Sequence, residues 1–78
     1  MPCFEVLDSM ANERIIGALR EMGVVKRYWK TGLLIVFEAD RPPSFNEVVE
    51  AVRRALPWYK AEEIAVYFMS YMPYPCGD

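Results

Sequence analysis

The stretch IAVYFMSYM, residues 64–72, decides the predicted fold, because it has the composition of a β-strand without a polar face. Apolar and aromatic side chains occupy both alternating sets of positions. An antiparallel strand that covers a single core normally alternates apolar with polar residues. We therefore expect a strand over 64–72 whose second face is covered by something other than the domain's own helices.

The other elements are predicted from the spacing of apolar residues. Three runs have the composition of strands, 4–7, 24–29 and 33–39, and two runs carry apolar residues at helical spacing, 10–22 and 45–56. The first helix has an N-cap candidate in Ser9. The second begins with Ser44 and Glu47 at the Ser-x-x-Glu spacing of a capping box.

Lys30, Thr31 and Gly32 separate the two middle strands and predict a tight hairpin with a three-residue loop. This register pairs Trp29 with Leu33 and keeps Lys30 out of the core. A two-residue loop would place Lys30 on the core side, which favours the longer loop.

The predicted order is strand, helix, strand, strand, helix, strand. Two right-handed crossovers over one sheet give an α+β ferredoxin-like βαββαβ sandwich, with strand order 4-1-3-2 and both helices on one face. We expect a single domain over 1–72 and an irregular tail over 73–78.

The face of this sheet that the helices leave open is expected to be broad, apolar and aromatic, with two acidic residues near its centre. The candidate interface or ligand-binding residues on it are Glu5, Tyr28, Leu34, Val36, Glu38, Tyr67, Met69 and Tyr71. Monomeric proteins rarely expose a contiguous apolar patch of more than a few hundred Å². The favoured interpretation is a small non-enzymatic interaction protein that forms a homodimer through this face.

Two other functions fit the same face. A dimeric α+β barrel, enzymatic or not, could hold a small apolar or cationic ligand between Glu5, Glu38 and the tyrosines. Alternatively, Lys26 and Arg27 pair with the two carboxylates and no ligand binds. An inhibitor or adaptor would instead offer the face to a foreign protein.

Composition argues against several classes of function. The net charge of −2 gives no basis for binding nucleic acid, and no run is long and apolar enough to span a membrane, so we expect a cytoplasmic protein. The chain has no histidine, which removes the commonest general base and metal ligand. We expect no metal and no cofactor, and an enzyme is the less favoured interpretation.

The cysteines Cys3 and Cys76 are too far apart in sequence for a metal-binding pair motif. In the predicted topology the first and last strands are antiparallel neighbours, which brings Cys3 close to the tail. A disulfide between the two cysteines and a pair of free thiols both fit this arrangement.

Overall fold

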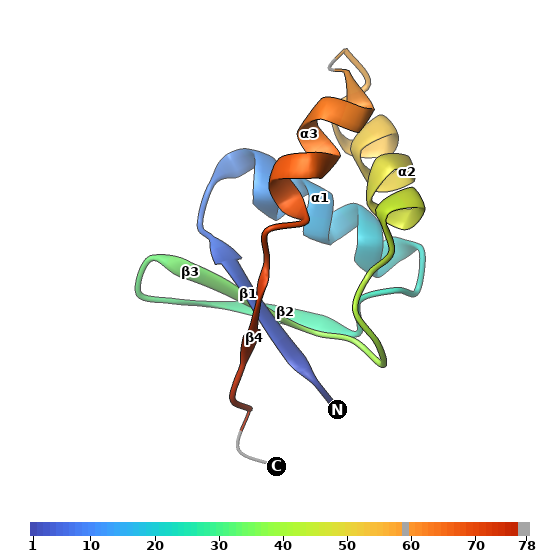
Figure 1. Cartoon of the computed structure of the whole chain (residues 1–78). Helices are drawn as coiled ribbons and strands as arrows, with labels where there is room; N and C mark the ends of the chain where they lie inside the picture. Colours follow the sequence, from blue (N-terminus) through green and yellow to red (C-terminus); the bar gives the residue numbers. More distant parts are fainter. Residues whose placement is uncertain (59, 77–78) are drawn as a thin grey trace.

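The computed structural model describes residues 1–58 and 60–76, which form an α+β fold with one four-stranded sheet. The strands are β1 (Cys3–Leu7), β2 (Arg27–Thr31), β3 (Leu34–Glu38) and β4 (Met72–Tyr74), and the helices are α1 (Met10–Glu21), α2 (Phe45–Ala55) and α3 (Ala61–Phe68). All strand pairs are antiparallel, and the order β2-β3-β1-β4 is the predicted one. The three helices lie together on one side of the sheet (Figure 1).

The first two helices begin where their capping residues predict. The Ser9 side chain accepts a hydrogen bond from the Asn12 backbone N–H at 3.0 Å, which caps α1. At α2 both halves of the capping box form: Ser44 Oγ accepts from the Glu47 N–H, and the Ser44 N–H donates to Glu47 Oε1.

The predicted strand over 64–72 is wrong, because most of this stretch is helical. Ala61, Ala65 and Phe68 are buried at positions i, i+4 and i+7, so they form the inward face of α3. The last strand starts at Met72 and includes Pro73, whereas the sequence predicts an irregular tail from Pro73 onward. Pro73 is tolerated there because β4 is an edge strand.

The hairpin register also differs from the prediction. Thr31 pairs with Leu34, so the loop has only two residues, and Gly32 at its first position has a φ of +57°. This geometry fits a type II′ turn, which suits the twist of a hairpin. Lys30 does lie on the helix side, but its long stem carries Nζ out to Glu13 at 3.1 Å and Asp8 at 3.5 Å.

The core lies between the sheet and the helices. From the sheet, Phe4, Val6, Ile35 and Phe37 pack against buried side chains of all three helices. An aromatic cluster of Phe4, Phe37, Phe68 and Tyr71 joins β1 and β3 to the end of α3, with ring centroids 5.3–6.0 Å apart. This cluster fixes the point from which the chain enters β4.

Candidate binding surface

The strand register arranges the open face of the sheet in three rows, because residues opposite each other on adjacent strands point to the same side. From β4 to β2, the first row is Tyr74, Cys3, Glu38 and Arg27, the second is Met72, Glu5, Val36 and Trp29, and the third is Leu7, Leu34 and Thr31. The third row has no β4 member, since the described pairing of β4 with β1 stops at Met72.

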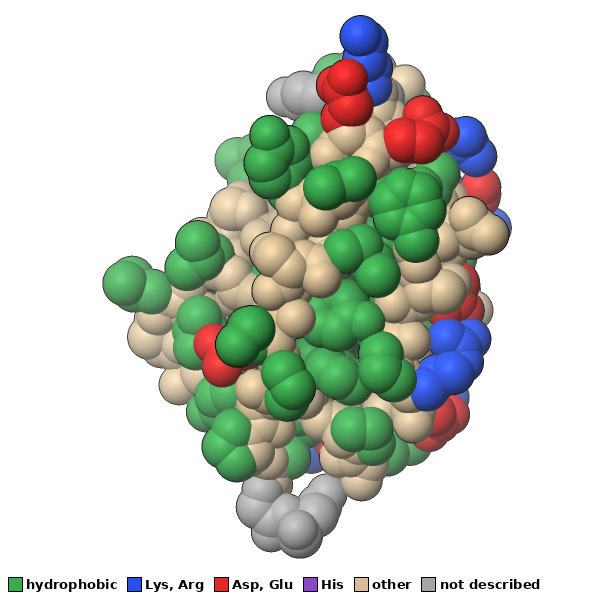
Figure 2. Space-filling model, in the orientation of Figure 1, with side chains coloured by type: hydrophobic (Ala, Val, Ile, Leu, Met, Phe, Trp, Pro, Cys, Tyr) green, Lys and Arg blue, Asp and Glu red, His purple; other side chains and the backbone are tan. Residues whose placement is uncertain are grey.

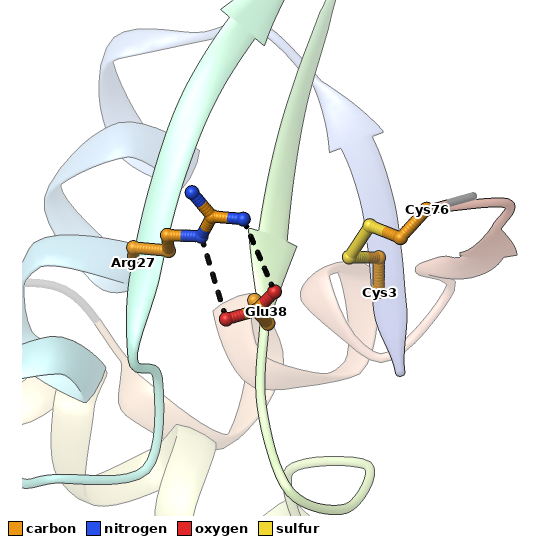
Figure 3. Close-up of a disulfide and its surroundings, with 4 residues drawn as sticks. All are labelled: Cys3, Arg27, Glu38 and Cys76. Atoms are coloured by element: carbon orange, nitrogen blue, oxygen red, sulfur yellow. Dashed lines mark hydrogen bonds and ion pairs between the residues drawn. A yellow bond between two sulfur atoms is a disulfide. The ribbon is translucent and has the colours of Figure 1, made fainter. Parts of the chain in front are cut away.

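Three residues of the first row take part in covalent or ionic contacts: Cys3 forms a disulfide, and Arg27 and Glu38 form an ion pair (Figure 3). Cys3 and Cys76 are joined, with their Cα atoms 5.9 Å apart, which confirms that the topology brings the cysteines together. Arg27 meets both carboxylate oxygens of Glu38, Nε to Oε1 at 3.4 Å and Nη2 to Oε2 at 3.4 Å. The same guanidinium lies 5.1 Å from the ring centroid of Trp29.

The second row contains a carboxylate among apolar neighbours. Glu5 is partly buried, with Val36 on one side and Met72 on the other. Val36 itself has an exposed fraction of 0%, because neighbouring side chains cover it. The centre of the open face is therefore not an exposed apolar surface.

Several exposed apolar side chains gather at the end of the sheet that contains the third row. The group comprises Leu7 (68% exposed), Leu33 in the hairpin (81%), the half-buried Leu34, Tyr67 at the end of α3 (77%) and Met72 (61%), and we call these five residues the apolar end patch. Figure 2 shows hydrophobic side chains gathered over the hairpin, β1 and β4, with an acidic side chain among them.

A groove of about 370 Å³ runs through the apolar end patch, in the space that β4 leaves beside the end of β1. Its lining residues are Glu5, Val6, Leu7, Asn12, Leu34, Tyr67, Ser70 and Met72. Asn12 Nδ2 donates to the Leu7 carbonyl at 2.9 Å, and Ser70 Oγ donates to the Tyr67 carbonyl at 2.7 Å. These bonds hold the two polar side chains against the groove walls.

The structure brings three of the eight candidate residues together in this groove, namely Glu5, Leu34 and Tyr67. Val36 and Glu38 lie on the open face as expected, but Val36 is buried and Glu38 is paired with Arg27.

Three candidates lie elsewhere. Tyr28 is opposite Phe37 and not Leu34, on the helix side, because the observed register differs from the predicted one by three positions, and an odd shift reverses the faces. Met69 ends α3 and packs against the core. Tyr71 belongs to the aromatic cluster, where its hydroxyl donates to the Pro43 carbonyl at 3.0 Å and burial raises its pKa.

Leu33, Met72 and Asn12 are missing from the predicted binding surface. The predicted three-residue loop puts Leu33 on the core side, and Met72 is the end of the longer predicted strand over 64–72. An apolar residue directly after Gly32, in a position suited to a two-residue turn, is the signal that could have identified Leu33.

The described residues contain no group of three or more His, Cys, Asp or Glu side chains that could hold a metal ion. Within the same residues, no helix is long and apolar enough to cross a membrane. No protein-family model, curated protein or solved structure matches the chain.

Proposed function

We propose that this chain is a small non-enzymatic interaction protein that forms a homodimer through the apolar end patch and the adjoining open face of the sheet. The observation that carries the proposal is the contiguity of the patch. Leu7 is opposite Leu34, and Leu33 is the turn residue directly before Leu34. Tyr67 and Met72 line the same groove as Leu7. Monomeric proteins seldom leave such a surface in water.

The composition of the surface supports a protein interface. Tyr and Met are enriched at the centres of interfaces and charged residues are depleted there. The ion pair between Arg27 and Glu38 lies outside the patch, in the first row of the open face, where it would form a polar rim. A two-fold axis is the usual symmetry for such a contact, because it pairs the same patch on both chains.

The proposal is tested by measuring mass in solution by sedimentation over a wide range of protein concentration. The wild type should be a dimer, and Leu33→Asp should be a monomer, because it buries a charge at an apolar contact. Leu33 is exposed and lies in a turn, so its replacement leaves the core intact. Tyr67→Asp should act in the same way.

The matched control is Arg20→Ala, which makes the same change in net charge at an exposed position of α1, away from the patch. It should remain dimeric. A wild type that stays monomeric at every concentration would contradict the homodimer and favour a foreign protein as the partner. An unchanged dimer in Leu33→Asp would remove the patch from the interface.

The proposal extends to fold and compartment. The element order and strand order support a ferredoxin-like sandwich in which α3 is an additional helix between α2 and β4.

We also propose the cytoplasm as the compartment. A disulfide such as Cys3–Cys76 is found there mainly in proteins of hyperthermophiles, and a chain rich in Glu, Arg, Ile and Val without Gln fits such a source.

A further inference from the structure

Glu5 carries a negative charge that no described basic side chain neutralises. The two cations that could have paired with it are engaged elsewhere: Arg27 meets Glu38, and Lys26 Nζ lies 3.5 Å from Asp40. Across residues 1–58 and 60–76, no Lys or Arg nitrogen lies within ion-pair distance of the Glu5 carboxylate. Its neighbours across the sheet, Val36 and Met72, are apolar.

The other polar groups of the groove are left mainly as hydrogen-bond acceptors. The Ser70 hydroxyl uses its only hydrogen on the Tyr67 carbonyl, which leaves the lone pairs of Oγ. Asn12 uses one hydrogen of Nδ2 on the Leu7 carbonyl, which leaves Oδ1 as an acceptor and one N–H as a donor. A carboxylate with two such neighbours complements a group that has several donors and a positive charge, and it repels anions.

The walls of the groove complement an apolar body. Leu7, Leu34 and Met72 contribute aliphatic and thioether surface, and Tyr67 contributes an aromatic ring. The volume of 370 Å³ falls in the range typical of small-molecule pockets, which is about 300–1,000 Å³. Apolar walls with a few convergent polar groups are the usual composition of such pockets.

We propose that this groove binds a small organic ammonium ion, with the ammonium group on Glu5 and the apolar body against Leu7, Leu34, Tyr67 and Met72. The groove is formed by one chain, so the inference goes beyond the proposed homodimer and does not require it. Four of the five residues of the apolar end patch line the groove, so the ammonium ion and a second chain would compete for the same surface.

The test uses three probes with the same phenylethyl body: 2-phenylethylamine, 2-phenylethanol and 3-phenylpropanoate at neutral pH. Binding is followed by titration of ¹⁵N-labelled full-length protein, observing backbone amide signals. The amine should shift the amides of Leu7, Asn12, Ser70 and Met72. The alcohol should bind about tenfold more weakly and the anion should not bind, because a hydrogen bond to a charged group is strong enough for that difference.

Two isosteric variants test whether binding of the amine depends on the charge of Glu5. Glu5→Gln should weaken binding of the amine about tenfold and leave the alcohol unchanged. Glu38→Gln, on the same face but paired with Arg27, is the control and should bind the amine like the wild type. The amide spectrum of each variant without probe shows whether it is folded.

Equal binding of amine and alcohol, full affinity in Glu5→Gln, shifts confined to another surface, or no shift would each overturn the inference. Sedimentation without probe and the same titration of Leu33→Asp, whose changed residue does not line the groove, separate this result from the dimer. A probe-free monomer that binds the amine keeps the site and rejects the homodimer. A monomeric Leu33→Asp that does not bind the amine rejects the site, whatever the oligomeric state of the wild type.

Discussion

Glu47 is the residue whose interactions most clearly couple local structure to pH. Its carboxylate accepts two hydrogen bonds from the Arg41 guanidinium, at 2.8 and 2.6 Å, and one from the Ser44 backbone N–H at 2.9 Å. These partners, Arg41 foremost, lower the pKa of Glu47 from its ordinary value of 4.5 to about 2. The folded state therefore favours the ionised form, and the stability that this provides is present above the unfolded pKa near 4.5 and is lost as pH falls towards 2.

Glu47→Gln tests this coupling, because glutamine keeps the capping box and removes the charge. We expect the variant to lose about 1 kcal/mol at pH 7, a modest value because the Arg41 side chain is 61% exposed and water screens the pair. We also expect a shallower fall in unfolding free energy between about pH 5 and pH 2. Urea unfolding at several pH values measures both.

Glu50→Gln on the same helix is the control. Glu50 pairs with exposed Arg54, a contact that contributes little, so this variant should keep the pH dependence of the wild type. A Glu47→Gln variant with the unaltered pH dependence would show that Glu47 does not couple to folding. The sequence predicts the capping box from Ser44 and Glu47 alone. It does not predict the contact between Arg41 and Glu47, because that contact depends on the path of the backbone through residues 40–43.

At the scale of single elements, two glycines are expected to respond in opposite ways to alanine. Gly17 lies in the middle of α1 with nothing within 4 Å of an added Cβ, so Gly17→Ala should raise the unfolding free energy by about 0.5–1 kcal/mol. Gly32 holds the hairpin turn at a φ of +57°, so Gly32→Ala should lower it by about 1 kcal/mol or more.

Thermal unfolding of both variants beside the wild type measures these changes, and each variant serves as the control for the other. Equal shifts in the same direction would contradict the assignment of Gly17 to a regular helix and Gly32 to a left-handed turn position.

The element that sequence reasoning missed, α3, shows why short apolar runs are ambiguous. Within residues 61–68 the spacing of Ala61, Ala65 and Phe68 fits a helix, while Ile64, Val66 and Phe68 alternate like a strand. Tertiary packing selects the helix, since α3 packs against α2 and places Ala61, Ala65 and Phe68 in the core. The acidic first turn, Glu62 and Glu63, was the available sign of a helix start.

At the scale of the whole molecule, the strand order and the meeting of Cys3 with Cys76 were predictable, because both follow from antiparallel placement of the first and last strands. The binding surface was predicted only in part. Its location depends on the hairpin register and on where α3 ends, and a shift by an odd number of residues in a strand moves every side chain to the other face. Tyr28 left the open face for this reason, and Leu33 entered the apolar end patch.

The disulfide links positions 73 residues apart, so it should govern the stability of the entire chain. Beyond the bridge, the described pairing of β4 consists of three residue pairs with β1, and Tyr71 anchors the chain just before it. In the chain-entropy model, closing a loop of this length adds about 4 kcal/mol. Reduction by a dithiol should therefore lower Tm by more than about 15 °C, while β1, β2 and β3 remain paired at moderate temperature.

Cys76→Ser separates the bridge from other effects of the reductant. Cys76 is preferable to Cys3 for replacement, because Cys3 is a buried residue of β1 and its replacement would also alter packing. The variant should unfold like the reduced wild type, and added dithiol should leave it unchanged. Thermal scans, with thiol titration of the denatured protein to verify the redox state, provide the measurement. Equal Tm values for the oxidised and reduced wild type would show that the three β4 pairs and Tyr71 hold the C-terminal segment without the bridge.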